Sequence, residues 1–449
     1  MPRDEILRRE GYGPTSAGVG RRGAHTRQRI IAEALRQFEV HGYYATSFKT
    51  IAKAIGISPP TLYQYFESKQ QIFRELLEEC GRALARLVRR IGPLGPTKIG
   101  FDNLHWWLGE WAYTYDKYAA MHVQWAIINA ADNPLRPMVA GFLARFHEHI
   151  AERLRTAEFN ELDPLDAANA LTSTVHRFLY LIHSDFAPPR EDDVLLDGLA
   201  AAMQLMLFPQ TPGNALTAII AIPPPPLSEA GQWAHFANVR KPSSTPGTGA
   251  GRPLREVGPR GEATRRMILD EGARMITERG YHETRIDDLM AGMGLSRGTF
   301  YKNFPEKIDL LLELAEECAS AFEWLAARFA AIDPNRDVRG QLRDWLHDYL
   351  PVRARYFGVI AAWLAGSWTD PRLMPTATRA VGAQHQAVIE VLRQLGRNYP
   401  FDSAVAATVM SSMLERLPAT LFETRVRSQP ETAEVMAALI DRALFSTGG

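Results

Sequence analysis

Cysteine is scarce in this chain, and long apolar runs are missing. Cys80 and Cys318 are the two cysteines among 449 residues, which excludes a disulfide scaffold and favours a reducing compartment. No stretch is apolar for long enough to cross a bilayer. The first residues, MPRDEILRRE, lack the apolar core of a signal peptide. We therefore expect a cytoplasmic protein with no membrane partner.

Net charge is also absent, because 51 basic residues balance 51 acidic ones. A function in nucleic acid binding would therefore have to rest on local charge. We find no Gly-rich phosphate loop, no nucleophile elbow and no spaced set of metal ligands. His147 and His149 are two residues apart, which on a helix directs them to different faces. We expect no enzyme activity, no cofactor and no metal.

The chain does contain a duplication. TSFKTIAKAIGISPPTLYQYFESK at 46–69 returns as TRIDDLMAGMGLSRGTFYKNFPEK at 284–307, an offset of 238 residues. Between 26–80 and 264–318, 19 of 55 ungapped pairs are identical, which chance does not produce. Such self-similarity at a fixed offset indicates a tandem repeat.

The first copy has the pattern of a helix-turn-helix. Ile51 and Ile55 recur at helical spacing, and Gly56 follows where a left-handed turn residue is needed. Ser58 then stands at an N-cap position, with Pro59 at the first helical position. Two short helices joined in this way present the second one to the major groove of DNA.

Both copies resemble the DNA-binding domain of TetR-type bacterial regulators. The shared marks are Thr-Arg in the first helix, Gly-Tyr before the second, Gly-x-Ser in the turn, Thr-x-Tyr-x-x-Phe in the recognition helix and Lys at the start of the fourth. The resemblance implies an all-α fold with two tandem TetR-like units. Each unit would be a three-helix DNA-binding domain followed by a helical ligand-binding and dimerisation domain.

The duplication extends past the DNA-binding part. Trp107 and His147 align with Trp345 and His385 at the same offset, and a two-residue deletion then aligns Asp166 with Asp402. Proline and glycine crowd the stretch between the copies, which indicates a linker. We therefore divide the chain into a flexible N-terminal arm (1–24), a first DNA-binding domain (25–80), a first helical regulatory domain (81–208), a linker (209–260), a second DNA-binding domain (261–318) and a second helical regulatory domain (319–449). We expect near nine helices in each half.

Candidate DNA contacts follow from the resemblance. It implies that Tyr63, Tyr301, Lys69 and Lys307 hold phosphates and that the recognition helices face base edges, where sequence is read. Gln64 suits adenine, and Arg297 or Lys302 suits guanine. Phe66 and Phe304 are expected in the core. The full set predicted at DNA is Thr46, Ser47, Pro60, Thr61, Tyr63, Gln64, Tyr65 and Lys69 in the first copy, and Thr284, Arg285, Arg297, Gly298, Thr299, Tyr301, Lys302, Asn303 and Lys307 in the second.

The two predicted DNA-binding domains, 25–80 and 261–318, are called the first and second head below, and they are unlike. Residues 21–79 carry 9 basic and 6 acidic side chains, whereas 259–317 carry 9 and 12, so the second head is the weaker electrostatic candidate. SPPTLYQY and SRGTFYKN also present different edges. Because operator symmetry mirrors protein symmetry, we predict a monomer that acts as a pseudo-dimer on an asymmetric double-stranded operator. A homodimer of tandem chains stays open as an alternative.

The helical remainder should do two jobs. The last two helices of each half suit an intramolecular four-helix bundle that replaces a dimer interface. The earlier helices could enclose an apolar effector pocket, although aromatics at helical spacing usually belong to the core. The candidate lining residues are Trp107, Trp111, Tyr118, Trp125, Trp345, Tyr349, Tyr356 and Trp363. By resemblance to tandem TetR regulators, a lipid- or steroid-related effector is expected.

The leading hypothesis is thus a ligand-responsive transcriptional repressor. The alternative is a non-enzymatic protein that binds a ligand or partner and in which one or both heads no longer bind DNA. Salt-dependent binding to promoter DNA separates the two.

Overall fold

The structure is a computed structural model of the chain, and it is helical throughout. It describes residues 21–123, 136–157, 159, 162–183, 190–216, 259–364, 370–395, 402–424 and 426–445. Within these ranges every regular element is an α-helix or a 3₁₀-helix, which confirms the all-α prediction. In the same ranges no helix combines the length and apolarity needed to cross a bilayer. The N-terminal arm up to residue 20 and the linker from 217 to 258 lie outside the described residues.

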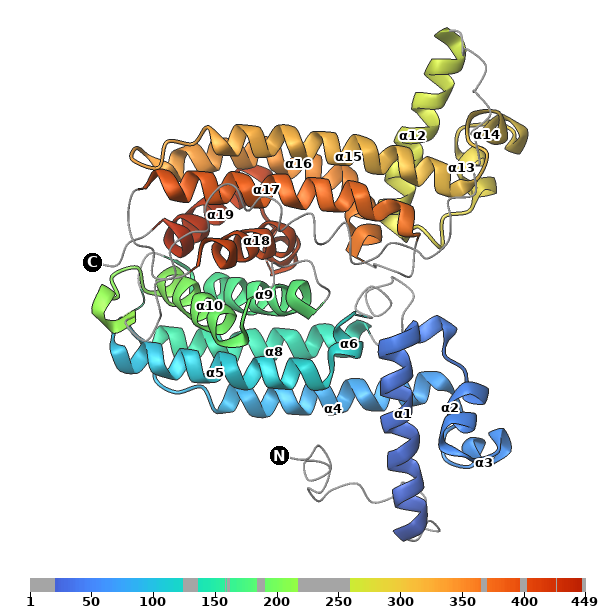
Figure 1. The fold of residues 1–449 in the computed structure, drawn as a ribbon, viewed down its shortest axis with the longest axis horizontal. Helices are drawn as coiled ribbons and strands as arrows, with labels where there is room; N and C mark the ends of the chain where they lie inside the picture. Colours follow the sequence, from blue (N-terminus) through green and yellow to red (C-terminus); the bar gives the residue numbers. More distant parts are fainter. Residues whose placement is uncertain are drawn as a thin grey trace. The chain divides into compact units, whose positions relative to one another are not determined.

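The described part of the first half contains nine α-helices and a short 3₁₀-helix (Figure 1). They are α1 (Arg21–Ala45), α2 (Phe48–Ile55), α3 (Pro59–Tyr63), α4 (Lys69–Arg89), α5 (Lys98–Lys117), α6 (Ala119–Val123), α8 (Arg136–Arg155), α9 (Pro164–His183), α10 (Asp192–Leu207) and η2 (Gly213–Leu216).

The described part of the second half repeats this order. Its helices are α12 (Pro259–Arg279), α13 (Ile286–Gly292), α14 (Arg297–Asn303), α15 (Lys307–Ala330), α16 (Val338–Leu364), η5 (Pro371–Leu373), α17 (Met374–Gln394), α18 (Ser403–Thr424) and α19 (Gln429–Leu444). The first half breaks at Tyr118 into α5 and α6. The second half continues through the matching Tyr356 as a kink with φ −103° and ψ 16°. The halves are therefore similar in outline, as predicted, and differ at this joint.

The chain forms two compact units that do not coincide with the halves. One unit combines Met1–Arg86 with Thr114–Val139, and the other combines Leu87–Tyr113 with Ala140–Gly449. The first head thus groups with the end of α5 and with α6. The second head groups with the helical bodies of both halves.

The short helices of the first head begin and end at the residues that the sequence indicates. Ser47 Oγ accepts from the Thr50 N–H at 3.2 Å, and Thr50 Oγ1 accepts from the Ser47 N–H at 3.1 Å, which closes a capping box on α2. Gly56 ends α2 in the left-handed region at φ 74°. Ser58 Oγ then accepts from the Thr61 N–H at 3.2 Å and caps α3. These local signals confirm the predicted helix-turn-helix.

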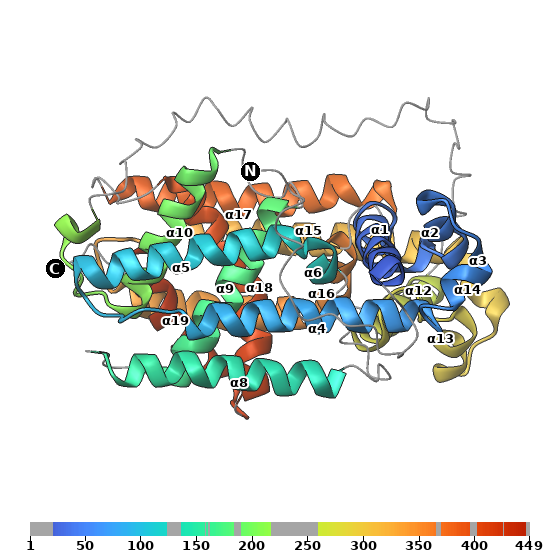
Figure 2. The same cartoon turned by 90° about the horizontal axis from the view of Figure 1, so that it is seen from below.

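The last two helices of each half pack together, as predicted. Within the second unit α9 packs against α18, and α10 packs against both α19 and α18. Figures 1 and 2 show α9 and α18 side by side in both views. Buried faces such as Leu171 to Val175 on α9 and Ala437 to Ile440 on α19 are sealed in this bundle. Burial of apolar surface of this kind contributes about 25 cal/mol per Å², so the packing of α9 and α10 against α18 and α19 stabilises the contact between the halves.

The predicted alignment of Asp166 with Asp402 is wrong at the helix start. Asp402 precedes α18, and its Oδ1 accepts from the Ala404 N–H at 2.7 Å. In the first half that role belongs to Asp163, whose Oδ1 accepts from the Leu165 N–H at 2.9 Å. The sequence pattern could not separate two nearby aspartates, since both suit a helix N-terminus.

Candidate DNA-binding heads

Each head is held together by the same arginine in the same place. Arg27 of α1 pairs with Glu75 of α4, and its guanidinium carbon lies 4.6 Å from the centre of the Phe66 ring. In the second head Arg265 pairs with Glu313 and lies 4.3 Å from the Phe304 ring centre. Phe66 and Phe304 are buried, as expected for core residues. The arginine of the Thr-Arg motif in the first helix therefore packs and pairs inside each head.

Several residues predicted at DNA in the first head are exposed on α3 and just after it. Tyr63 is 59% exposed, and its ring centre lies 4.8 Å from that of Phe48 on α2. Pro60 and Gln64 are exposed, whereas Tyr65 is partly buried. Thr61 is also partly buried, and its Oγ1 shares a 2.8 Å hydrogen bond with Ser58 Oγ. The head thus offers an amide, a phenol and an apolar edge to a groove.

The second head offers positive charge on α14. Arg297, Gly298 and Lys302 are exposed, and Tyr301 is 45% exposed. Thr299 is partly buried and shares a 3.0 Å hydrogen bond with Ser296 Oγ. Two basic groups on one short helix are well suited to phosphate or guanine. The second recognition helix is therefore not buried, which the prediction of two working heads requires.

Three predicted DNA residues are buried instead. Thr46 is 2% exposed and Thr284 is 1% exposed, and their Oγ1 atoms donate to the Gly42 and Gly280 carbonyls at 2.8 and 2.9 Å. Asn303 is also buried, and its Nδ2 donates to the Thr299 carbonyl at 2.8 Å. Their side chains are committed to these internal hydrogen bonds, so DNA contact by these three residues stays a prediction that would have to rely on main-chain groups. Ser47 and Arg285 remain exposed at the N-caps of α2 and α13.

The two lysines expected at phosphates are engaged inside the heads. Lys69 Nζ donates to the Tyr43 and Thr46 carbonyls at 2.6 and 2.8 Å and lies 4.2 Å from the Tyr43 ring centre. Lys307 Nζ donates to the Tyr281 and Thr284 carbonyls at 2.9 and 3.0 Å. Partial burial lowers the pKa of both ammonium groups. Each lysine thus fastens the turn before the second helix with at least two of its three N–H groups, which leaves at most the third for a phosphate.

Arg297 has two neighbours that the sequence did not reveal. Its Nη1 lies 3.4 Å from Asp287 Oδ2 on α13, and its Nη2 donates to the Tyr301 hydroxyl at 3.3 Å. These partners orient the guanidinium over the exposed face of α14 and raise its pKa. Both members of the ion pair are well exposed, so the pair itself adds little stability. The ten-residue spacing across the turn gives no periodic signal that would have revealed it.

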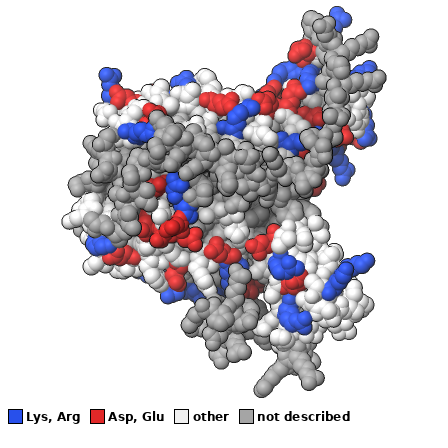
Figure 3. Space-filling model, in the orientation of Figure 1, with Lys and Arg blue, Asp and Glu red and all other residues white. Residues whose placement is uncertain are grey.

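Ion pairs also tie the first helix of the second head to its regulatory helices. Asp270 of α12 accepts from Arg266 at 2.7 Å and from Arg355 of α16 at 2.5 Å, while Arg266 also pairs with Glu317 of α15. Figure 3 shows acidic and basic side chains interleaved around α12. These hydrogen bonds lower the pKa of Asp270. The matching first-half position is Ala32, so the first head cannot form this network.

The aromatics predicted to line a pocket are core residues in this structure. Seven of the eight are described and all seven are buried, while Trp125 lies outside the described residues. Trp107 Nε1 donates to the Leu87 carbonyl at 3.1 Å, and Trp345 Nε1 donates to the Leu325 carbonyl at 2.8 Å. The same indole bond in each half identifies a packing role. Contact with an effector stays a prediction.

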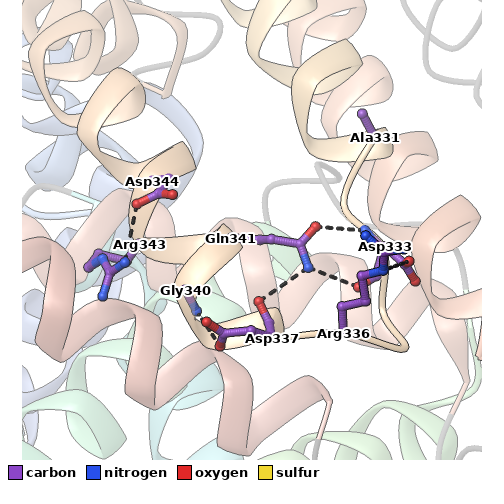
Figure 4. Close-up of a pocket in the computed structure, with 8 residues that line it drawn as sticks. All are labelled: Ala331, Asp333, Arg336, Asp337, Gly340, Gln341, Arg343 and Asp344. Carbon is purple, nitrogen blue, oxygen red and sulfur yellow. Dashed lines mark hydrogen bonds and ion pairs between the residues drawn. The ribbon is translucent and has the colours of Figure 1, made fainter.

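A separate hollow of about 500 Å³ lies at the loop between α15 and α16 (Figure 4). It is polar, unlike the predicted effector pocket. Gln341 Nε2 donates to the Asp333 and Asp337 carbonyls at 2.9 and 3.2 Å, and the Asp333 N–H returns a bond to Gln341 Oε1 at 2.9 Å. These polar groups satisfy one another and hold the loop.

Known proteins match these heads. The model of the family described as bacterial regulatory proteins, tetR family, matches twice, at residues 30–76 and 268–314. The HTH-type transcriptional regulator UidR of Escherichia coli (strain K12) is 30% identical over 154 residues, which is 33% of this chain and 74% of UidR. The chain belongs to the TetR family of bacterial regulatory proteins. It is a DNA-binding transcriptional regulator with two tandem TetR units.

Further relatives match one unit's length of the chain. The HTH-type transcriptional regulator EthR of Mycobacterium tuberculosis (strain ATCC 25618 / H37Rv) is 27% identical over 189 residues, covering 41% of this chain and 85% of EthR. A crystal structure of a transcriptional regulator from Saccharomonospora viridis in complex with choline is 26% identical, covers 39% of this chain and 94% of that chain, and has a TM-score of 0.33. PfmR from Thermus thermophilus is 20% identical, with 39% and 96% covered and a TM-score of 0.31.

Proposed function

We propose that this TetR-family regulator is a repressor whose two unlike heads bind an asymmetric operator. A small apolar effector would bind the helical body and weaken DNA binding. The chain would act as a monomer in the cytoplasm, with its two halves taking the places of the two subunits of a dimer. The single observation that carries this proposal is the contrast between the exposed faces of α3 and α14.

That contrast is chemical. At the matched positions after the capping serine, the first head exposes Pro60 where the second exposes Gly298, and Gln64 where the second has Lys302. The second head adds Arg297, already oriented by its neighbours. An amide suits adenine, whereas a guanidinium suits the two acceptors of guanine. Heads that share a scaffold but differ at these positions should prefer different half-sites.

Mutagenesis with DNA footprinting tests this proposal. Arg297→Ala should cost about 1–3 kcal/mol of binding and relax preference in one half-site, and Gln64→Ala should do so in the other. Arg336→Ala is the control, because its side chain is 83% exposed in the α15–α16 loop. The proposal fails if each variant weakens both half-sites equally. It also fails if binding to the DNA flanking the gene shows no decline with salt.

The effector part of the proposal rests on polar atoms left without partners inside the second half. Trp363 and Gln384 are each 4% exposed, and within the described part of the chain neither the Trp363 Nε1 nor the Gln384 amide has a hydrogen-bond partner. Phe322 lies between the two aromatics of α16, with its ring centre 6.0 Å from Tyr349 and 6.5 Å from Trp363. Each unmade bond costs about 1–3 kcal/mol. An effector with an apolar body and a hydrogen-bonding group would recover that energy.

A gel-shift assay with candidate effectors tests this part. Fatty acids, fatty acyl amides and steroids should release operator DNA when they reach this interior, because an effector shifts the equilibrium only through unequal affinity for two states. Gln384→Met keeps the volume and removes the amide, so it should weaken release without changing DNA affinity. Release that is unaffected by Gln384→Met and by Trp363→Phe would contradict the assignment of the interior to the effector.

A further inference from the structure

The interface between the halves carries a reciprocal pair of ion pairs. Arg427, two residues before α19, holds Asp166 in the first turn of α9, with Nη2 2.7 and 2.6 Å from the two carboxylate oxygens. Arg190, two residues before α10, places Nε 3.3 Å from Oδ2 of Asp402 at the start of α18. Each half therefore supplies an aspartate to the other half's arginine. All four side chains are at least mostly buried.

These two ion pairs approximate the reciprocity of a two-fold dimer interface, where residue i meets j and j meets i, although Asp402 caps α18 whereas Asp166 lies within the first turn of α9. Similar ion pairs could form if two identical halves were paired. Two first halves could pair Arg190 with Asp166 twice, and two second halves could pair Arg427 with Asp402 twice. These contacts therefore orient the bundle but do not select which halves meet.

A third cross-half ion pair breaks this symmetry. Arg177 of α9 pairs with Glu415 of α18, and the Arg177 guanidinium carbon stacks 4.1 Å from the Tyr180 ring centre. The Arg177 side chain is 8% exposed and that of Glu415 is 20% exposed. Asp166 is the only acidic residue in α9. If α9 faced a second α9, the Asp166 carboxylates would sit at the helix starts, and α9 would have no carboxylate left for Arg177.

We infer that Arg177 and Glu415 determine which halves pair. Their ion pair favours packing of α9 and α10 against α18 and α19, and it disfavours packing of α9 and α10 against a second copy of themselves. The inference rests on the packing of the halves and not on DNA binding, so it can stand or fall separately from the proposed function. Its consequence is that each assembled body carries one head of each kind.

The selection acts against one wrong pairing in particular. Breaking a buried ion pair while leaving one charge in place is strongly unfavourable, whereas replacing both members with apolar residues is often tolerated. Pairing of two first halves would bury Arg177 twice without Glu415, its partner in the mixed pairing. Two second halves are less penalised, because the Glu415 side chain is 20% exposed and the Arg177 side chain is 8% exposed. Specificity built on a repulsive element in the wrong complex is a general device of protein interfaces.

The tether must be opened to expose this selection, because linkage alone keeps the halves of one chain together at millimolar effective concentration. A protease site inserted between residues 216 and 259 of the full chain allows it to be cut after folding. Tagged and untagged cut proteins are then mixed until halves exchange, and native mass spectrometry counts the pairings. Cut wild type should give only first-half with second-half pairs. Arg177→Leu with Glu415→Leu should also give first-half dimers.

Charge reversal provides the second arm. Arg177→Glu alone should weaken the mixed pairing on the order of 100- to 1,000-fold, and adding Glu415→Arg should restore it. The matched control is Glu148→Leu with Arg155→Leu, because that pair on α8 is 2.7 Å long and about half exposed; it should leave pairing at the wild-type result. First-half dimers in cut wild type would overturn the inference, as would exclusively mixed pairing in the double leucine variant.

Discussion

Replacing Lys69 with methionine should destabilise the first head rather than merely weaken its grip on DNA. The ammonium donates to two backbone carbonyls at 2.6 and 2.8 Å and lies 4.2 Å from the Tyr43 ring centre. Hydrogen bonds to charged groups contribute about 1.5–3 kcal/mol each, and a cation–π contact adds about 0.5–1 kcal/mol. Relief of the ammonium's desolvation offsets part of this. We expect a net loss of about 2–3 kcal/mol in the unfolding free energy of the head.

Urea unfolding and salt-dependent gel shifts, measured together, decide between the two roles. A structural lysine predicts a lower unfolding midpoint for Lys69→Met. If the lysine only contacts phosphate, stability should be unchanged, and the slope of log binding constant against log salt concentration should become shallower by about one. Lys302→Met is the matched control, since that lysine is exposed on α14 and should change only the slope. Unchanged stability of Lys69→Met would refute the reasoning.

Two further predictions concern the helical bodies. Burial lowers the pKa of His147 to about 4 and that of His385 to about 3, while the unfolded chain titrates near 6.5; the folded state then binds fewer protons between these values, so stability should fall as pH drops below about 6.5. Each histidine should cost about 2 kcal/mol of unfolding free energy at pH 5. In urea unfolding, His147→Gln with His385→Gln should therefore lose less stability between pH 7.5 and pH 5 than the wild type does. An equal loss of stability in that variant would contradict this. Gly358→Ala should destabilise by about 1–3 kcal/mol in thermal unfolding, because the new Cβ would lie 2.7 Å from the backbone of Ile276 on α12. Gly382→Ala should instead stabilise by about 0.5–1 kcal/mol, because none of the described residues outside its own helix turn comes within 4 Å of its new Cβ. A change of the same sign in both variants would contradict the role of the close contact between Gly358 and α12.

Local signals predicted much of this molecule. Gly56 and Ser58 fixed the turn and the cap of α3, because backbone conformation at those positions depends on few neighbours. The repeat then predicted the order of helices in one half from the other, apart from the joint at Tyr118 and Tyr356. It also placed Phe66 and Phe304 in the core correctly, since large aromatics at matched helical positions rarely stay in water.

The features that the sequence did not predict are set by tertiary packing. On a helix of only two turns, exposed and buried faces cannot be separated by periodicity, so Asn303 was expected at DNA although it faces inward. Thr46 and Thr284 precede helices and were expected at a groove, but tertiary packing buried them. The pair of Arg427 with Asp166 joins residues 261 positions apart, and no local pattern encodes such a contact.

Selection of preferred sites from randomised DNA tests the central claim most directly. The wild type should enrich two half-sites of different sequence. Pro59→Arg, Pro60→Gly and Gln64→Lys together give the first head the exposed chemistry of the second at positions that are all exposed, so this variant should enrich a palindrome of the second half-site. A palindrome from the wild type, or identical sites from both proteins, would contradict the account of two unlike heads in one chain.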